Sequence, residues 1–343
     1  MKKIYIDISF IYNNKTGIGQ YVENLILALK DNVNLEYFDL KLPQKLKFKS
    51  IFWILWLNSY IYIKTLIKRP KAIFFPAFFM PYFKVKNVKY YTVIHDLCHL
   101  REGEMTKYFK FIYNLSTNIS IKRADIIVTV SETIKQELIE AFNISPNKIK
   151  VTYNSIGQHF INPAIDNNIL QKYDIDKDKY ILSVATLNKR KNIPDLIKAF
   201  EKISSKYPNL KLVLVGGMGN EQREKLTQHK NVIFTGYIAD EELPTLYKNA
   251  MFYVFPSLYE GFGIPLIEAQ EMSCPVLCSD IPVFREVAGE SAEFTTTESD
   301  GIVEKFEYLI NNPERREELI KLGSENVKRF STDKILEQLK EII

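Results

Sequence analysis

Cysteine is scarce in this chain of 343 residues, which contains only Cys98, Cys274 and Cys278. An odd and sparse set excludes a disulfide framework as the basis of the fold and indicates a reducing compartment. Cys274 and Cys278 have a spacing that some metal sites use. The run "CPVLC" that contains them is apolar, however, and predicts a buried strand with structural thiols.

A long hydrophobic run is also missing. The most apolar stretch, residues 51–63, has 13 residues and includes Asn58 and Ser59, whereas a membrane-spanning helix needs about 20 apolar residues. The segment 1–14 lacks the apolar centre and the small-residue cleavage site of a secretory signal. We therefore expect no transmembrane helix, a first strand at residues 2–9, and a cytoplasmic location.

Acidic residues are few in the first half of the chain. Residues 1–165 contain 23 Lys and Arg but 12 Asp and Glu, a net charge of +11, whereas the remainder contains 23 and 29, a net charge of −6. A basic half indicates a polyanionic partner. Segments 41–57 and 63–91 mix lysines with aromatic residues, which favours an anionic membrane surface or a lipid-linked acceptor, although the same aromatics would suit a core. Because no nucleic-acid recognition motif is present, we expect no nucleic-acid partner.

Short apolar runs alternate with amphipathic stretches along the whole chain, a pattern typical of parallel sheets covered by helices. The runs predict strands at residues 2–9, 72–76, 89–96, 124–131, 148–154, 180–186, 211–217, 231–237, 252–257, 275–280 and 292–296. The sequence thus predicts an α/β fold of two doubly wound Rossmann-like domains that face a central cleft. We place the domains at 1–165 and 170–330, with a linker at 154–168, and expect the amphipathic segment 331–343 to return to the first domain.

Ligands in such folds bind where strands end. Gly17 and Gly19 precede a predicted helix, a place suited to a phosphate, although two glycines would equally form a tight turn. The third glycine of a dinucleotide fingerprint is absent, since Val22 stands in its place. Arg190 and Lys191 lie at a second strand–helix junction, where cations oppose the helix dipole unless an anion binds. This junction therefore predicts a diphosphate site.

A histidine, His95, ends a further strand, and we interpret it as a hydrogen-bonding group of the cleft. A zinc site formed by His95, Cys98 and His99 is the alternative. It is disfavoured because a short loop offers no closed set of ligands. We expect no metal.

Two glutamates frame the turn "EGFGIPLIE". Pro265 suits the first turn of a helix, so Glu260 is predicted to lie in the loop and Glu268 in the helix. Gly261 and Gly263 expose amides between them. Amides that bind an anion, together with carboxylates that accept hydrogen bonds from hydroxyls, suit a nucleotide sugar.

Taken in order, these motifs resemble the retaining glycosyltransferases of family 4, which have the GT-B fold. "EGFGIPLIE" is similar to the E-x7-E motif of that family. The runs "GIGQYVENL", "VIHDL", "VSETIKQEL", "LSVATLNKRKNIPDLIKAF", "LVLVGG" and "PVLCSDIPVFREVAGESAEF" follow the family's order over nearly the whole chain.

The resemblance implies a role for each matched position. Catalysis would fall to Glu260, His95, Arg190 and Lys191. The donor would contact a wider set: Gly17, Gly19, Arg190, Lys191, Tyr237, Ile238, Glu260, Gly261, Phe262, Gly263, Ile264 and Glu268. Within it, Glu260 would hold the sugar, Glu268 the ribose hydroxyls, and the Tyr237 turn the base. Three positions depart from the family: Thr186 in place of a common arginine, Lys189 in place of a common proline, and Ala185 in place of a glycine. The first of these gives Arg190 more weight.

The resemblance also implies an activity, which is that of a retaining, metal-independent hexosyltransferase without a cofactor. It would use a GDP-, UDP- or dTDP-sugar in bacterial capsule or lipopolysaccharide synthesis, with a lean toward mannosyl or rhamnosyl transfer. The acceptor would be a glycan, expected to be lipid-linked, and the enzyme would lie on the inner face of the cell membrane. The alternatives are a sugar-nucleotide 2-epimerase of the same fold and an inactive partner subunit of a glycosyltransferase.

Overall fold

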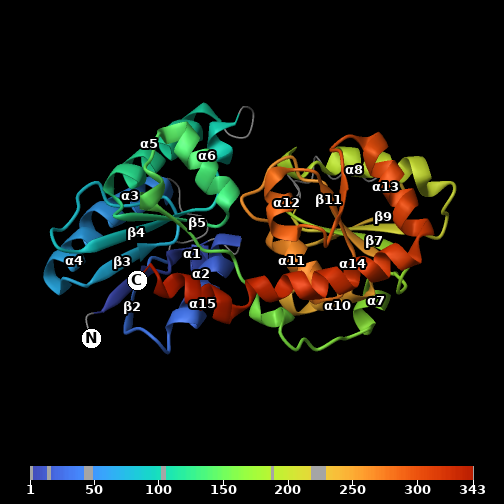
Figure 1. Ribbon diagram of the computed structural model, residues 1–343, viewed down its shortest axis with the longest axis horizontal. Coiled ribbons are helices and arrows are strands. Elements are labelled where there is room, and N and C mark those ends of the chain that lie inside the picture. The colour runs from blue at the N-terminus through green and yellow to red at the C-terminus, as the bar shows by residue number, and fades with distance from the viewer. Residues whose placement is uncertain are drawn as a thin grey trace. The chain divides into compact units, whose positions relative to one another are not determined.

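The chain divides into two units, Met1–Ser155 with Thr332–Ile343, and Ile156–Ser331 (Figure 1). The structure is a computed structural model, and it describes residues 3–13, 17–41, 49–101, 106–186, 189–217 and 229–342. The boundary after Ser155 assigns residues 156–165 to the second unit, although the sequence had placed them with the first. The physical reason is that Phe160 is fully buried and packs against the Tyr247 ring, 5.7 Å between centroids.

The first unit has a six-stranded parallel sheet in the order β2-β1-β3-β4-β5-β6. Its strands are β1 (Ile4–Asp7), β2 (Leu35–Phe38), β3 (Ala72–Phe75), β4 (Lys89–Ile94), β5 (Ile126–Thr129) and β6 (Ile149–Val151). Its helices are α1 (Ser9–Asn13), α2 (Gly17–Leu29), α3 (Lys49–Trp56), α4 (Tyr62–Lys68), α5 (Lys107–Arg123), α6 (Glu132–Phe142) and α15 (Thr332–Lys340), with a π-helical turn, η1 (Leu57–Ile61), between α3 and α4. The final helix, α15, packs against α2.

The second unit repeats the design with the strand order β12-β11-β10-β7-β8-β9, again all parallel. Its strands are β7 (Tyr180–Val184), β8 (Lys211–Val215), β9 (Val232–Gly236), β10 (Phe252–Phe255), β11 (Val276–Ser279) and β12 (Glu293–Thr295). Its helices are α7 (Asn168–Lys172), α8 (Ile193–Ser204), α10 (Leu243–Asn249), α11 (Ile264–Glu271), α12 (Pro282–Ala288), α13 (Ser299–Asn311) and α14 (Pro313–Asn326), with a short 3-10 turn, η5 (Lys189–Lys191), before α8.

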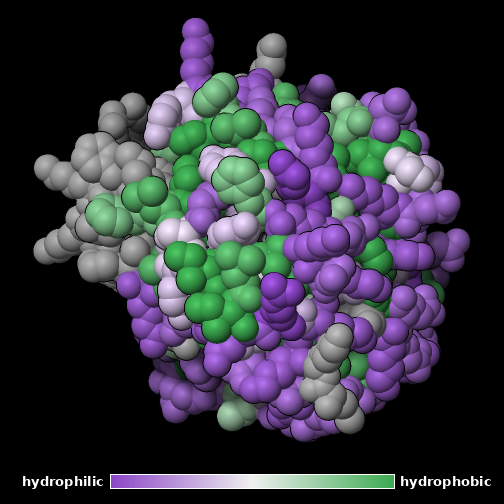
Figure 2. Space-filling model, turned by 90° about the vertical axis from the view of Figure 1, so that its left-hand side faces the viewer, coloured by the Kyte–Doolittle hydropathy of each residue, from purple (hydrophilic) through white to green (hydrophobic). Residues whose placement is uncertain are grey.

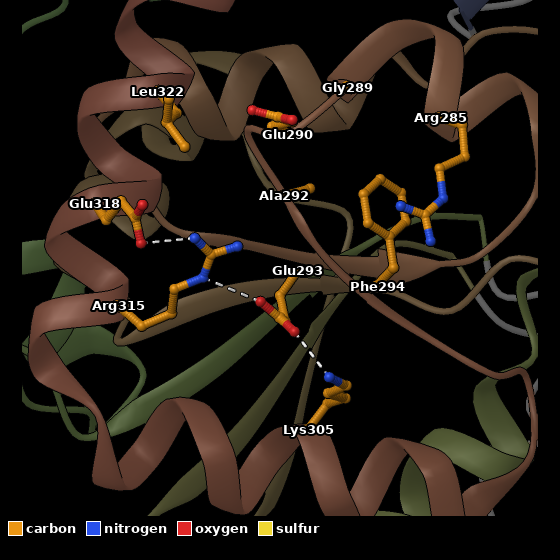
Figure 3. Close-up of a pocket in the computed structure, with 10 residues that line it drawn as sticks. All are labelled: Arg285, Gly289, Glu290, Ala292, Glu293, Phe294, Lys305, Arg315, Glu318 and Leu322. Carbon is orange, nitrogen blue, oxygen red and sulfur yellow. Dashed lines mark hydrogen bonds and ion pairs between the residues drawn. The ribbon is translucent and has the colours of Figure 1, made fainter.

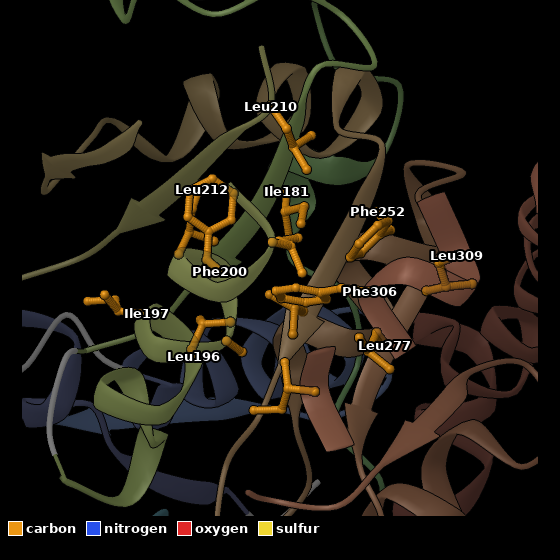
Figure 4. Packing of buried hydrophobic residues seen from close by; sticks show 14 of the residues in the cluster. Ile181, Leu196, Ile197, Phe200, Leu210, Leu212, Phe252, Leu277, Phe306 and Leu309 are labelled. Atoms are coloured by element: carbon orange, nitrogen blue, oxygen red, sulfur yellow. The ribbon is translucent and has the colours of Figure 1, made fainter. Parts of the chain in front are cut away.

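The core of the second unit shows why the apolar runs form strands. Ile181, Leu212, Phe252 and Leu277 come from four strands of the sheet and are all fully buried. Helices α8 and α13 cover them, and the Phe306 ring of α13 lies 5.6 Å from the Phe252 ring (Figure 4). Strands covered on both faces need continuous apolar sequence, which is the pattern that the sequence displays.

The predicted fold class, two doubly wound α/β domains, is confirmed by these two sheets. Each of the eleven predicted strands corresponds to an observed strand, and β2 is the strand that was not predicted. Cys278 lies on β11, and Cys274 precedes it; both thiols are buried and free. Across the described ranges, no helix combines the length and the apolar character that crossing a bilayer requires.

Candidate functional site

The direction in which the chain winds through the second sheet reverses between β7 and β10, which are neighbours. Open α/β sheets bind ligands in the crevice outside the carboxyl ends of strands at such a switch point. Lys189–Lys191 follow β7 and Glu260 follows β10, so both predicted groups lie at this point. The strand order brings them together although they are 69 residues apart in sequence.

The two cations meet the carboxylate directly. Lys191 Nζ donates to Glu260 Oε1 at 2.5 Å, and Arg190 Nη1 lies 3.6 Å from Glu260 Oε2. Two backbone contacts tie the loops together: the Leu258 amide donates to the Arg190 carbonyl at 2.8 Å, and Arg190 Nη1 donates to the Tyr259 carbonyl at 3.4 Å. Glu260 is only 7% exposed. The three formal charges sum to +1, and at this degree of burial they are screened much less than surface charges.

Helix α8 begins directly after these cations, and no side chain caps its N-terminus. The side chain of the N-cap residue, Asn192, instead donates to the Thr297 carbonyl at 2.6 Å. The first amides of a helix have no partner within the helix and carry its positive dipole end. Together with Arg190 and Lys191, they form a site suited to an anion with several oxygens.

The glycine loop between Glu260 and α11 is held by aromatic rings. Gly263 is the N-cap of α11 and has a φ of 101°, a conformation that strains other residues. A Cβ added there would lie 2.7 Å from the Phe284 ring. Phe262 is buried, and its ring meets the Phe330 ring edge-on at 5.4 Å. Gly261 and Phe262 lie between Glu260 and this N-cap, and Ile264 is the first residue of α11.

The second glutamate, Glu268, lies within α11 and is 5% exposed. The Tyr247 hydroxyl donates to its Oε2 at 3.4 Å. Burial raises the pKa of Tyr247 well above its usual value, so this phenol stays a proton donor at neutral pH. No sequence motif indicated this partner, which comes from the preceding helix α10.

The predicted base-binding turn follows β9. The Tyr237 side chain is 78% exposed, and its ring lies over Gly217, where an added Cβ would approach ring carbon Cε2 to 2.5 Å. Ile238, the next residue, is half-buried. Gly216 has a φ of 136°, and its added Cβ would lie 1.9 Å from the Ala185 carbonyl oxygen. The glycine pair after β8, Gly216 and Gly217, thus lets the Ala185 backbone and the Tyr237 ring approach closely. It was not among the predicted site residues, although the doublet in "LVLVGG" was a usable signal.

The remaining predicted residues lie in the first unit. Gly17 and Gly19 form the start of α2. His95 follows β4, and its Nε2 donates to the Pro76 carbonyl at 2.7 Å, while the Tyr21 ring meets the imidazole edge-on at 4.9 Å. Burial lowers the pKa of His95, so the ring is neutral at pH 7.

The alternative zinc site would use His95, Cys98 and His99 as ligands. His99 is 1% exposed, Thr117 Oγ1 lies 3.3 Å from its Nε2, and its ring stacks on Phe78. Within the part of the chain that the structure describes, no group of three or more His, Cys, Asp or Glu side chains is placed to hold a metal ion.

A buried carboxyl group, Asp7, ends β1 in the first unit. It accepts a hydrogen bond from the Ser9 amide at 3.0 Å, and burial nevertheless raises its pKa to about 6. Because the pKa is raised in the folded state, the stability that this group contributes is complete below about 3.8, the ordinary value, and is lost as the pH rises through about 6. Asp7 is therefore a cost to stability at neutral pH.

We expect Asp7→Asn to increase the free energy of unfolding by about 1–3 kcal/mol at pH 8, with the gain shrinking toward zero near pH 4. Asparagine keeps an oxygen for the Ser9 amide but carries no charge. Urea unfolding at pH 4.5 and 8, with the exposed Asp31→Asn as a control, measures the effect. A variant less stable than the natural chain at pH 8 would contradict the assignment.

A separate hollow of about 430 Å³ lies beside β12, α12, α13 and α14 (Figure 3). Glu293 accepts from Lys305 Nζ at 2.8 Å and from Arg315 Nε at 3.1 Å, and Arg315 also pairs with Glu318 at 2.7 Å. None of the predicted site residues lines this hollow. Because Glu293 of the edge strand β12 pairs with Lys305 and Arg315, we interpret the hollow as an ion-pair network that anchors this strand.

Comparison with known proteins gives two matches to family descriptions. Residues 166–326 match "Glycosyl transferases group 1", and residues 16–157 match "Glycosyltransferase Family 4". O-antigen chain mannosyltransferase B of Escherichia coli is 32% identical over 229 residues, which cover 63% of this chain and 58% of that protein. The chain thus spans little more than half the length of this relative.

A second relative and one solved structure extend the comparison. The capsular polysaccharide biosynthesis glycosyltransferase CapM of Staphylococcus aureus is 32% identical over 256 residues, which cover 70% of this chain and 67% of that protein. The structure of Anabaena HepE in complex with UDP and glucose superposes with a TM-score of 0.75 at 16% identity, covering 100% of this chain and 99% of that one. At this identity the similarity shows the fold alone, and it confirms the predicted GT-B fold.

Proposed function

Since this chain belongs to the group 1 and family 4 glycosyltransferases, we propose that it transfers a hexosyl or deoxyhexosyl residue from a nucleotide sugar to a glycan acceptor. The observation that carries the proposal is the cluster of Arg190, Lys191 and Glu260 at the switch point of the second sheet, next to the uncapped N-terminus of α8. Cations next to a helix N-terminus suit a diphosphate, and the buried carboxylate suits a sugar hydroxyl.

The chemistry that we propose is retaining. The bond between the anomeric carbon and the diphosphate oxygen breaks, the acceptor oxygen bonds to that carbon from the same face, and the acceptor proton passes to the departing diphosphate. Arg190, Lys191 and the α8 amides stabilise the negative charge that develops on the diphosphate, which is the largest contribution in reactions of this kind. No residue is assigned as a metal ligand, and no step requires a cofactor.

The remaining roles follow from position. We assign Glu260 and the amides of Gly261–Gly263 to the transferred sugar and Glu268 to the ribose hydroxyls. The exposed Tyr237 ring, which is held over Gly217, is assigned to the base, since an aromatic face stacks on any base. From the first unit, we assign His95, a neutral hydrogen-bonding group, to the sugar, and Gly17 and Gly19 at the start of α2 to the phosphate.

The pathway proposed is bacterial surface polysaccharide synthesis with a mannosyl donor, which is supported by the similarity to the E. coli O-antigen chain mannosyltransferase. GDP-mannose is therefore the first donor to test. UDP-sugars follow, because the Anabaena structure holds UDP. The acceptor that we propose is lipid-linked, and the basic first half of the chain, with its net charge of +11, supports a partner rich in phosphate.

Thermal-shift measurements with GDP-, UDP- and dTDP-sugars test the donor assignment. One nucleotide class should raise the unfolding midpoint, and at 100 times its Kd the stabilisation is about 2.7 kcal/mol. The same nucleotide should raise the midpoint of the Lys191→Met variant by a smaller amount, because one of the cations assigned to the diphosphate is gone. If none of the three classes raised the midpoint of the natural chain, the proposed function would be wrong.

A further inference from the structure

One helix of the first unit exposes apolar side chains where a surface helix normally exposes polar ones. Segments α3, η1 and α4 run without a break from Lys49 to Lys68. The stripe that faces solvent contains Phe52, Leu55, Ile63 and Ile67, with exposed fractions of 49%, 59%, 53% and 72%. The opposite side is buried through Leu57, Ile61 and Thr65. The helix is therefore apolar on both sides, and its core contacts do not account for the outer stripe.

The polar residues of this helix bond to backbone atoms. The Asn58 amide nitrogen donates to the Ile54 carbonyl at 2.8 Å, and its oxygen accepts from the Tyr82 amide at 2.7 Å. The Ser59 hydroxyl donates to the Leu55 carbonyl at 2.5 Å. Asn58 and Ser59 belong to the π-helical turn, which rotates the two halves of the helix relative to an uninterrupted α-helix. Because these polar groups are satisfied internally, the stripe can leave water without a large desolvation cost.

A neighbouring loop extends the apolar stripe. Phe83 is 64% exposed, and its ring packs edge-on against the Tyr62 ring of α4 at 6.2 Å. The helix outer face, defined here as Phe52, Leu55, Ile63, Ile67 and Phe83, therefore combines two segments. Figure 2 looks onto the side of the first unit at which α4 and α3 lie, and hydrophobic groups gather there beside hydrophilic ones.

The chain segment that carries this face has charges of one sign, although Glu36 and Asp125 from other elements lie near Lys64, Lys68 and Lys84. Residues 40–95 contain eleven Lys and Arg and no Asp or Glu. Among the described ones, Lys68, Lys86 and Lys89 are exposed. Lys68 lies one position beyond Ile67, and Lys86 follows Phe83 by three positions. Apolar side chains bordered by lysines are the combination that binds the headgroup layer of an anionic bilayer, in which apolar groups sink a few ångströms and cations meet lipid phosphates.

We propose that the helix outer face docks on an anionic membrane surface, with its apolar side chains in the headgroup layer and the adjoining lysines on lipid phosphates. A second copy of this chain is a poorer occupant, because a two-fold contact through this face would set lysines against lysines. The proposal rests on the proposed function in one respect only: a lipid-linked acceptor lies at that same surface. Docking itself requires neither donor nor acceptor.

Vesicle flotation of the full-length protein tests this docking without any nucleotide. Vesicles of phosphatidylcholine alone and with 30 mol% phosphatidylglycerol serve as the probes. We expect binding to the anionic vesicles, about fivefold weaker for each charge removed in Lys86→Gln with Lys89→Gln, and weaker in high salt. Ile63→Ser with Ile67→Ser should lower binding at least about tenfold. Both isoleucines are exposed, so the fold should be kept.

The matched control replaces exposed apolar residues of the second unit, Ile161→Ser with Tyr308→Ser, which are 45% and 41% exposed. This control should bind vesicles as the natural chain does. Three results would each overturn the proposal. The first is absence of binding to anionic vesicles, and the second is an equal loss of binding in the Ile63→Ser, Ile67→Ser variant and in the control variant. The third is a dimer in solution that only the Ile63→Ser, Ile67→Ser variant dissociates. All variants should keep the thermal shift with nucleotide sugar, so failure of docking is distinguishable from failure of the proposed function.

Discussion

Lys191→Met is expected to lower turnover of the nucleotide sugar by about 10²–10³-fold, as removal of one charge-stabilising donor does in other active sites. The Lys191 ammonium lies 2.5 Å from Glu260 and 5.0 Å from the centre of the Phe255 ring, so the site holds it in place before a substrate arrives. Methionine has an unbranched apolar side chain of similar length to the aliphatic part of lysine but carries no charge. Arg190 alone would then face both the diphosphate and Glu260. The rate of nucleoside diphosphate release measures the effect.

The matched control is Lys198→Met, seven residues further along. Its side chain is 63% exposed and pairs with Asp195 at 3.2 Å, a pair that contributes about 0.3–0.5 kcal/mol. We expect unchanged turnover in this control. Thermal unfolding of Lys191→Met separates a loss of chemistry from a loss of folding. Wild-type turnover in the folded Lys191→Met variant would show that Lys191 does not stabilise the leaving group.

Gly216→Ala is expected to have the second large effect, a loss of about 3 kcal/mol or more in the free energy of unfolding together with loss of donor binding. The added Cβ would lie 1.9 Å from the Ala185 carbonyl oxygen, a backbone atom that a side-chain rotation cannot move. The φ of 136° adds strain that only glycine avoids. The carboxyl ends of β7 and β8 would have to separate, and these ends carry the predicted diphosphate site.

Gly236→Ala separates the clash from the strain. Gly236 ends the neighbouring strand β9, has a φ of 71°, and would have nothing within 4 Å of an added Cβ. We expect a loss of about 1 kcal/mol for this variant, because only backbone strain is introduced. Chemical denaturation of both variants gives the comparison. Equal stability of the two would mean that the contact with Ala185 does not constrain the strand ends.

The strands were predictable because buried parallel strands need unbroken apolar runs, such as residues 211–215 and 252–255. Strand β2 was missed because Leu35–Phe38 is short and only its last residue is buried. No helix was predicted over Lys107–Arg123, the residues of α5. Its sequence, "KYFKFIYNLSTNISIKR", is rich in aromatic, β-branched and Asn or Ser residues of modest helix propensity, and tertiary contacts decide its conformation.

The motifs named Arg190, Lys191 and Glu260 as candidates, and the structure places these three residues together at the carboxyl ends of β7 and β10. That Lys191 and Glu260 form an ion pair depends on β10 lying beside β7, which follows from the order of strands in the sheet and not from local sequence. Tyr247 beside Glu268 is likewise a tertiary contact between α10 and α11. The outward apolar face of α3 and α4 was likewise not evident from local sequence. It is defined by which side chains of the helix are buried and which are exposed, and that depends on tertiary contacts.

The most direct measurement of the central claim is turnover of the nucleotide sugar chosen by thermal shift, with and without a lipid-linked glycan acceptor. Anomeric NMR signals identify the product in each mixture. We predict that nucleoside diphosphate is released only with acceptor, that the sugar keeps its anomeric configuration in the product, and that Lys191→Met abolishes nearly all release. Turnover without acceptor that yields an epimerised sugar would identify a 2-epimerase and contradict the proposed transfer.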